Sequence, residues 1–227
     1  MSSDFPRSPK FLKGALVSYQ SQFLGPIPNI IVFQYNPEQL SRTLSLRTPQ
    51  PGNGEENAGS ARAETFRVEG PPVENITLTV TLNAADQLEE PAINPLAVTK
   101  GLHPALSALE LLLYPPSSQF LLNSTLASAG SAQIEAQDTP LVLFIWGPSR
   151  VLPVRINSFS ITEEAFDQQL NPIQAKVELG LKVLSYMELR EESIGYGAYV
   201  ATQAQKEVMA RMNIVNNIEQ IAGMLPV

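Results

Sequence analysis

The chain has 227 residues, 44% of them hydrophobic, and its 15 Lys and Arg against 22 Asp and Glu give a formal charge of −7 at pH 7. This length and apolar content suffice for one domain with a real core, or for a domain with a small appendage. The acidic balance argues against nucleic acid as a partner, and the absence of cysteine excludes disulfides, thiolate metal sites and a cysteine nucleophile.

Neither a membrane span nor a secretory signal is expected from the sequence. The longest uninterrupted apolar stretch runs only from Leu141 to Trp146, whereas a spanning helix needs about twenty apolar residues. The N-terminal segment lacks the continuous apolar region of a secretory signal. We therefore expect the chain to fold in the cytoplasm without direct insertion into a membrane.

Alternating apolar and polar residues predict that most of the chain forms β-strands. The alternation is strict from Ile76 to Leu82, with threonines on the second face, and it recurs over residues 173–183. A weaker alternation over residues 40–47 is interrupted by Arg42. Further strands are expected at residues 12–19, 29–35, 64–69, 141–146 and 150–160. One wet face and one buried face are typical of antiparallel sheets, and about eight such strands indicate a barrel or a sandwich.

Two segments depart from the strand pattern and predict helices. Residues 102–113 place leucines at helical spacing, with Pro104 in the first turn. Such a helix could plug an open end of a barrel or cover one face. The second segment, from about Tyr199 to Leu225, follows Gly195 and Gly197, which we interpret as a hinge.

The second helix carries an apolar stripe without an obvious partner in its own segment. The stripe consists of Val208, Met212, Val215, Ile218, Ile221 and Leu225. The helix either packs back on its own barrel or forms an arm that docks on a neighbouring subunit. We accordingly divide the chain into a β-barrel domain at 1–190, with a flexible polar insertion at 48–62, and a hinge with a helical arm at 191–227.

The sequence does not favour catalysis. Adjacent acidic residues such as Glu163 and Glu164 diverge on a strand or a helix, so they do not make a catalytic pair. His103 is the only histidine and stands at the start of the first helix, where capping or packing is the ordinary role. We expect neither an enzyme, nor a cofactor, nor a metal site.

Three stretches together resemble a known family. Phe33 to Arg42 reads FQYNPEQLSR; Leu82 to Asp86 is followed by Gly101 to Leu106; and Pro140 to Gly147 reads PLVLFIWG. Their order and spacing are similar to those of baseplate and tube-associated proteins of contractile injection systems, which are phage-tail-like particles. The resemblance covers residues 12–186.

The resemblance implies a tube-type fold, in which two packed antiparallel sheets form a barrel with one helix. It further implies a structural subunit that forms a homo-oligomeric ring, expected to be hexameric, and connects the inner tube to the hub and spike. Other baseplate or sheath proteins would be further partners, and assembly would begin in the cytoplasm, with later release or membrane docking left open. Relatives that carry a LysM module continue beyond the barrel, whereas this chain ends in a helix, which leaves a glycan-binding role unsupported.

Several residues of the resembling stretches are candidates for an interface, although turn formation explains them equally well. Proline cannot donate to a ladder, so Asn36-Pro37 ends a strand, and Trp146-Gly147 ends another. The candidate residues are Asn36, Pro37, Glu38, Arg42, Trp146 and Gly147. Two alternatives remain open: a tube-terminating cap adaptor of the same particle, and a small-ligand-binding β-barrel.

Overall fold

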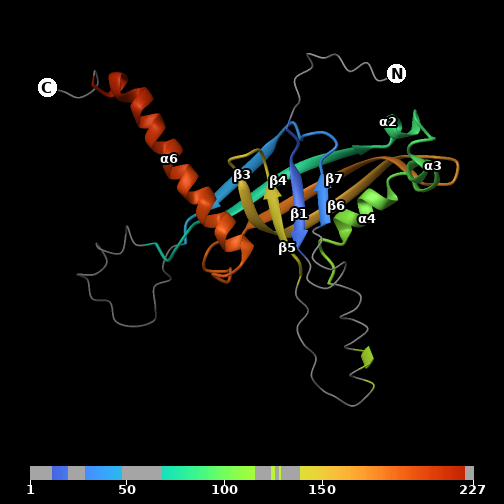
Figure 1. Ribbon diagram of the computed structural model, residues 1–227, viewed down its shortest axis with the longest axis horizontal. Helices are drawn as coiled ribbons and strands as arrows, with labels where there is room; N and C mark the ends of the chain where they lie inside the picture. The colour runs from blue at the N-terminus through green and yellow to red at the C-terminus, as the bar shows by residue number, and fades with distance from the viewer. Residues whose placement is uncertain are drawn as a thin grey trace.

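The computed structural model describes residues 12–19, 29–47, 68–115, 124, 125, 128 and 139–222. Its centre is one seven-stranded antiparallel sheet (Figure 1). The strands are β1 (Ala15–Tyr19), β2 (Asn29–Val32), β3 (Leu40–Ser45), β4 (Val73–Asn83), β5 (Leu141–Ile145), β6 (Val151–Phe166) and β7 (Pro172–Val183). Their order in the sheet is β2-β1-β5-β6-β7-β4-β3. The helices are α2 (Ala85–Leu88), α3 (Pro95–Lys100), α4 (His103–Glu110) and α6 (Ile194–Ala222).

The mainly β character expected from the sequence is confirmed. The alternating segments form β4 and β7, which pair along most of their lengths. The strands expected at 141–146 and 150–160 form β5 and β6, which pair as a hairpin with Gly147 in the turn. Strand β6 runs to Phe166, further than expected, with a register irregularity between Ile156 and Ser158. Of the strand expected at 64–69, only residues 68 and 69 are described, and neither lies in a strand.

The sheet curls so strongly that β1 and β4 approach each other although three strands separate them in the sheet order. The Phe33 amide donates to the Gly14 carbonyl just before β1 (2.9 Å), and the Gln34 side-chain amide exchanges two hydrogen bonds with the Asn83 backbone at the end of β4 (2.7 and 2.8 Å). In a flat sheet β1 and β4 would lie about 19 Å apart. The register adds about 46 Å along the strands, because Ala15 aligns through Ile145 with Val151, whereas Asn83 aligns through Gln174 with Ala165. Residues 33 and 34 can reach both strands only because the sheet bends.

The expected arrangement of two sheets in a closed barrel is not confirmed. Among the described residues, β2 and β3 each pair with a single strand, so the hydrogen-bonded ladder stays open. Residues 33–39 connect these two strands and contribute bends rather than a strand, and Pro37 has no amide hydrogen to donate. The finer architecture is therefore an open, curled sheet.

One hydrophobic cluster fills the inside of the curl. It joins side chains from both halves of the sheet, such as Leu16 and Phe144 on one side and Ile76 and Leu181 on the other. Helix α4 contacts β2, and Leu106 and Leu109 of α4 are buried in the same cluster, together with Leu102 and Leu112 beside it. The helix expected at 102–113 is thus confirmed, and it covers the inner face of the sheet.

Helix α6 begins on the sheet and then projects away from it (Figure 1). Gly195 and Gly197 lie inside this helix, so the hinge expected before the helix is not there. Gly195 has a packing role instead, since a Cβ atom at this position would stand 3.2 Å from the side chains of Leu141 and Leu189. No helix in the described part of the chain is long and apolar enough to cross a membrane. The predicted insertion at 48–62 lies outside the described residues.

Candidate functional site

Asn36, the centre of the first resembling stretch, holds the entrance to β1. Its side-chain amide donates to the Leu12 carbonyl (2.8 Å), and its side-chain oxygen accepts from the Gly14 amide (2.9 Å). The neighbouring Pro37 is half-buried, whereas Glu38 is exposed. Asn36 therefore fixes the strand that follows Leu12, which is a structural role within the chain.

Trp146 and Gly147 belong to the third resembling stretch, and the Trp146 ring lies next to Gly14, the residue that Asn36 also contacts. The Trp146 ring stacks on Phe144, with ring centroids 5.8 Å apart, and Gly147 adopts a positive φ of 71° in the β5–β6 turn. A Cβ atom on Gly14 would stand 2.8 Å from both the Trp146 ring and the Phe33 ring. The sequence analysis missed Gly14, which joins the first and third stretches, because a glycine before a strand carries no distinguishing pattern.

Arg42 belongs to a charged cluster at the base of α6 that the sequence analysis also missed. Its guanidinium contacts Glu74 of β4 at 2.6 Å, and Glu74 also lies 3.5 Å from Lys206 of α6. The Glu74 side chain is only 6% exposed. Burial lowers the pKa of Arg150, and the nearby Arg42 charge lowers it further, while Glu74 opposes the shift.

The register of the sheet explains why Arg42 interrupts the alternation of β3. Arg42 stands opposite Ile76 and Leu44 opposite Glu74, so all four side chains belong to the core-facing side of the sheet. On the core-facing side of β3 and β4, the ion pair of Arg42 and Glu74 therefore replaces apolar side chains. Three cationic groups thus surround one buried carboxylate in a protein whose net charge is −7.

The edge of β2 that pairs with no strand in the described part of the chain is a candidate surface for pairing with another chain. Because the Phe33 amide bonds to Gly14, the alternation of an antiparallel ladder turns the backbone groups of Ile30 and Val32 away from β1. The side chains of Ile30 and Val32 are 59% and 54% exposed. An exposed apolar edge strand is a ready template for a further strand.

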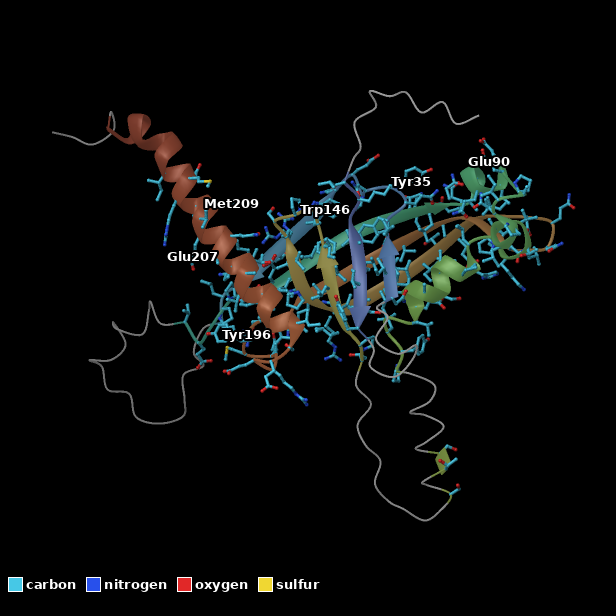
Figure 2. The ribbon with its side chains drawn as sticks, in the orientation of Figure 1. Tyr35, Glu90, Trp146, Tyr196, Glu207 and Met209 are labelled. Atoms are coloured by element: carbon cyan, nitrogen blue, oxygen red, sulfur yellow. The ribbon has the colours of Figure 1, made fainter. Side chains whose placement is uncertain are left out.

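Beyond the sheet, the projecting part of α6 exposes apolar side chains, among them Met209 (Figure 2). Of the stripe predicted for the arm, Val208 and Met212 are 48% and 61% exposed. The side chains of Val215, Ile218 and Ile221, and the whole of Leu225, lie outside the described residues.

A shallow hollow of about 490 Å³ lies on the outer face of the sheet. Ser41 of β3, Thr77 of β4 and Ser158 of β6 line the hollow, and Gly180 of β7 lies in the same row without a side chain. Glu178 supplies a carboxylate, but none of the lining residues is basic. Among the described residues no group of three or more His, Cys, Asp or Glu side chains gathers to hold a metal ion.

No protein-family model matches the chain, and no curated protein matches it.

Proposed function

We propose that the chain is a structural subunit of a contractile injection particle, forming a ring in the baseplate that connects the inner tube to the hub and spike. The support is the resemblance of the three stretches, together with the free, apolar edge of β2. The edge of β2 is the main structural support for this proposal, because one copy of the chain can pair a strand with it in another copy.

The curled sheet is proposed to act as a tube-type barrel within this ring. The hydrogen bonds of Phe33 and Gln34 to β1 and β4 support this idea, because they already bring the two halves of the sheet together. The single core cluster, to which both halves contribute, supports it as well. In the ring, a neighbouring strand would extend the ladder at the open edge of β2.

A proline at position 30 tests the ring directly. Ile30→Pro removes a backbone N–H that points away from β1, so it leaves the β1–β2 ladder intact and blocks pairing with a neighbour. We expect the wild-type chain to form rings, alone or with the other particle components, and Ile30→Pro to form none. Ring formation is measured by light scattering after size exclusion and by negative-stain microscopy.

Ile30→Ala is the matched control for this proline variant. It removes the same apolar side chain but keeps the backbone N–H, so we expect rings in reduced amount. If Ile30→Pro formed rings as abundantly as the wild type, β2 would not be the edge through which copies pair. A wild-type chain that stays monomeric in the presence of all particle components would overturn the function itself.

The projecting part of α6 is proposed to hold a neighbouring component of the particle. The cut that isolates this part follows Lys206, because Tyr199 packs against the core and Thr202 donates to the Val151 carbonyl (2.8 Å). Deletion of residues 207–227 should therefore leave the thermal unfolding of the body nearly unchanged while lowering the yield of assembled particles. Intact particles at wild-type yield would contradict this role.

Two other functions are separated by simple measurements. A cap adaptor at the far end of the tube would crosslink to cap proteins rather than to the spike. A carrier of small ligands would need a hollow interior. Here the interior is filled by side chains such as Phe33, Leu152 and Leu179, each of which is at most 2% exposed.

A further inference from the structure

Arg150, directly before β6, is a half-buried cation whose guanidinium has no partner among the described residues. Its side chain makes neither a hydrogen bond nor an ion pair with that part of the chain. Burial is the main cause that lowers the pKa of Arg150, and the charge of Arg42 lowers it further. The protein therefore holds a positive charge where its own groups stabilise it less than water would.

The backbone on both sides of this guanidinium is held in place. The Trp146 amide donates to the Arg150 carbonyl (2.8 Å), and the hydroxyl of Thr202 in α6 donates to the carbonyl of Val151 (2.8 Å). Leu152, two residues after Arg150, is buried in the core. Alternation along the strand therefore places the Arg150 side chain on the core-facing side of the sheet, beside the base of α6.

The carboxylate nearest in charge to Arg150 is already shared by two other cations. Oε1 of Glu74 accepts a hydrogen bond from Nε of Arg42 (2.7 Å), and Oε2 lies 3.5 Å from Nζ of Lys206. The Glu74 side chain is buried, whereas those of Arg42 and Lys206 are partly exposed. Three cations that solvent can reach thus share one carboxylate, in a chain whose net charge is −7.

We propose that Arg42, Arg150 and Lys206 bind a carboxylate carried by an acidic segment of another protein chain. A guanidinium offers two parallel N–H groups that match the two oxygens of a carboxylate. Arg150 has these donors free within the described part of the chain, while Arg42 and Lys206 attract the same carboxylate without leaving Glu74. The bound carboxylate would bring the cluster closer to neutrality.

The surroundings favour an acidic peptide over other anions. A nucleic acid would extend far beyond the three cations, and the net charge of −7 would repel it. A small free anion is held best in an enclosed pocket, whereas the side chains of Arg42 and Lys206 are 29% and 43% exposed. A carboxylate on a peptide gains further contacts from the rest of that peptide, so it needs no such enclosure.

This site goes beyond the proposed ring. It uses neither the edge of β2 nor the projecting part of α6. Failure of the carboxylate to bind would therefore leave the ring standing, and a chain that forms no ring could still bind an acidic peptide.

The test measures binding of hexaglutamate, labelled with a neutral dye, to the full-length chain by fluorescence anisotropy at low ionic strength. We expect binding that weakens as salt is added, because partly exposed charges are screened, and no binding of hexaglutamine. Arg150→Gln should weaken binding about tenfold, the effect of losing a hydrogen bond between charged groups. Arg150→Lys keeps the charge but loses the paired donors, so its affinity should lie between the two.

Arg155→Gln is the matched control, because it removes the same charge from the same strand. Arg155 is exposed, and its neighbours Val154 and Ile156 are buried in the core. Its side chain therefore lies on the outer face of the sheet, away from the proposed site. Arg155→Gln should bind hexaglutamate within about twofold of the wild type. Circular dichroism establishes that each variant is folded, and Arg150→Lys carries the test if Arg150→Gln is not.

Each result decides the inference. Weaker binding in the Arg150 variants with normal binding in Arg155→Gln supports it. A wild-type chain that does not bind hexaglutamate, or equal affinities of the Arg150 and Arg155 variants, overturns it. If an oligothymidine of similar charge bound more tightly than hexaglutamate, with the same dependence on Arg150, the acidic peptide would be the wrong ligand and the inference would fail.

Discussion

Glu74→Gln is expected to lower the free energy of unfolding by about 1–3 kcal/mol, because it removes the buried carboxylate that pairs with the partly exposed Arg42 and Lys206 side chains. Glu74 is 6% exposed and contacts both Arg42 and Lys206, while Arg150 lies close enough to feel its charge. The neutral amide keeps the size of the side chain, so the loss reports the charge. Urea unfolding at pH 7 measures the change.

The same substitution should also loosen the base of α6. Lys206 would lose its contact with the sheet, so backbone amides around Thr202 should exchange with solvent faster than in the wild type. Glu178→Gln serves as the control, because Glu178 is an exposed carboxylate on the same sheet without an ion-pair partner among the described residues. It should change stability by less than about 0.5 kcal/mol. Equal effects of the two variants would refute the cluster as the anchor of α6.

Gly101→Ala is expected to destabilise the protein by about 3 kcal/mol or more, because two independent costs coincide. Gly101 has φ 55° and ψ −132°, which only glycine adopts without strain. A Cβ atom there would also stand 2.4 Å from the Pro172 carbonyl oxygen. The Leu102 amide donates to this same oxygen (2.8 Å), so the clash would displace the start of α4.

Gly197→Ala provides the matched control in the same chain. Gly197 lies inside α6, has no heavy atom within 4 Å of the position of an added Cβ, and does not have positive φ. Alanine there should raise stability by about 0.5–1 kcal/mol, because glycine is the poorer helix former. Thermal unfolding of both variants compares the two sites. A Gly101→Ala protein as stable as the wild type would show that β7 and α4 adapt without cost.

The alternation of residues was a reliable guide to the strands because it is a local property. Ile76 to Leu82 and residues 173–183 each carry an apolar set on one face, and a shift by one residue would expose that set to water. The helix at 102–113 was predictable for the same reason, from leucine spacing and Pro104. The interruption at Arg42 was visible in the sequence, but its reason was not.

The candidate surfaces were only partly accessible to sequence reasoning. Asn36 and Trp146 were identified as notable residues, but their meeting at Gly14 depends on contacts between segments more than a hundred residues apart. The apolar stripe of α6 was visible in sequence as well. Which side of that helix faces the body could not be read from it, because Gly195, Thr202 and Lys206 show their role only against β5, β6 and β4.

A mainly β chain with a covering helix and a long terminal helix follows from the residue pattern, because the period of apolar residues dictates which segments can bury one face. The extent of the curl, the edges that stay open among the described residues, and the link from Arg42 through Glu74 to α6 became visible only in the fold. These features arise from pairings between distant segments, whose geometry depends on the whole sheet rather than on any single stretch.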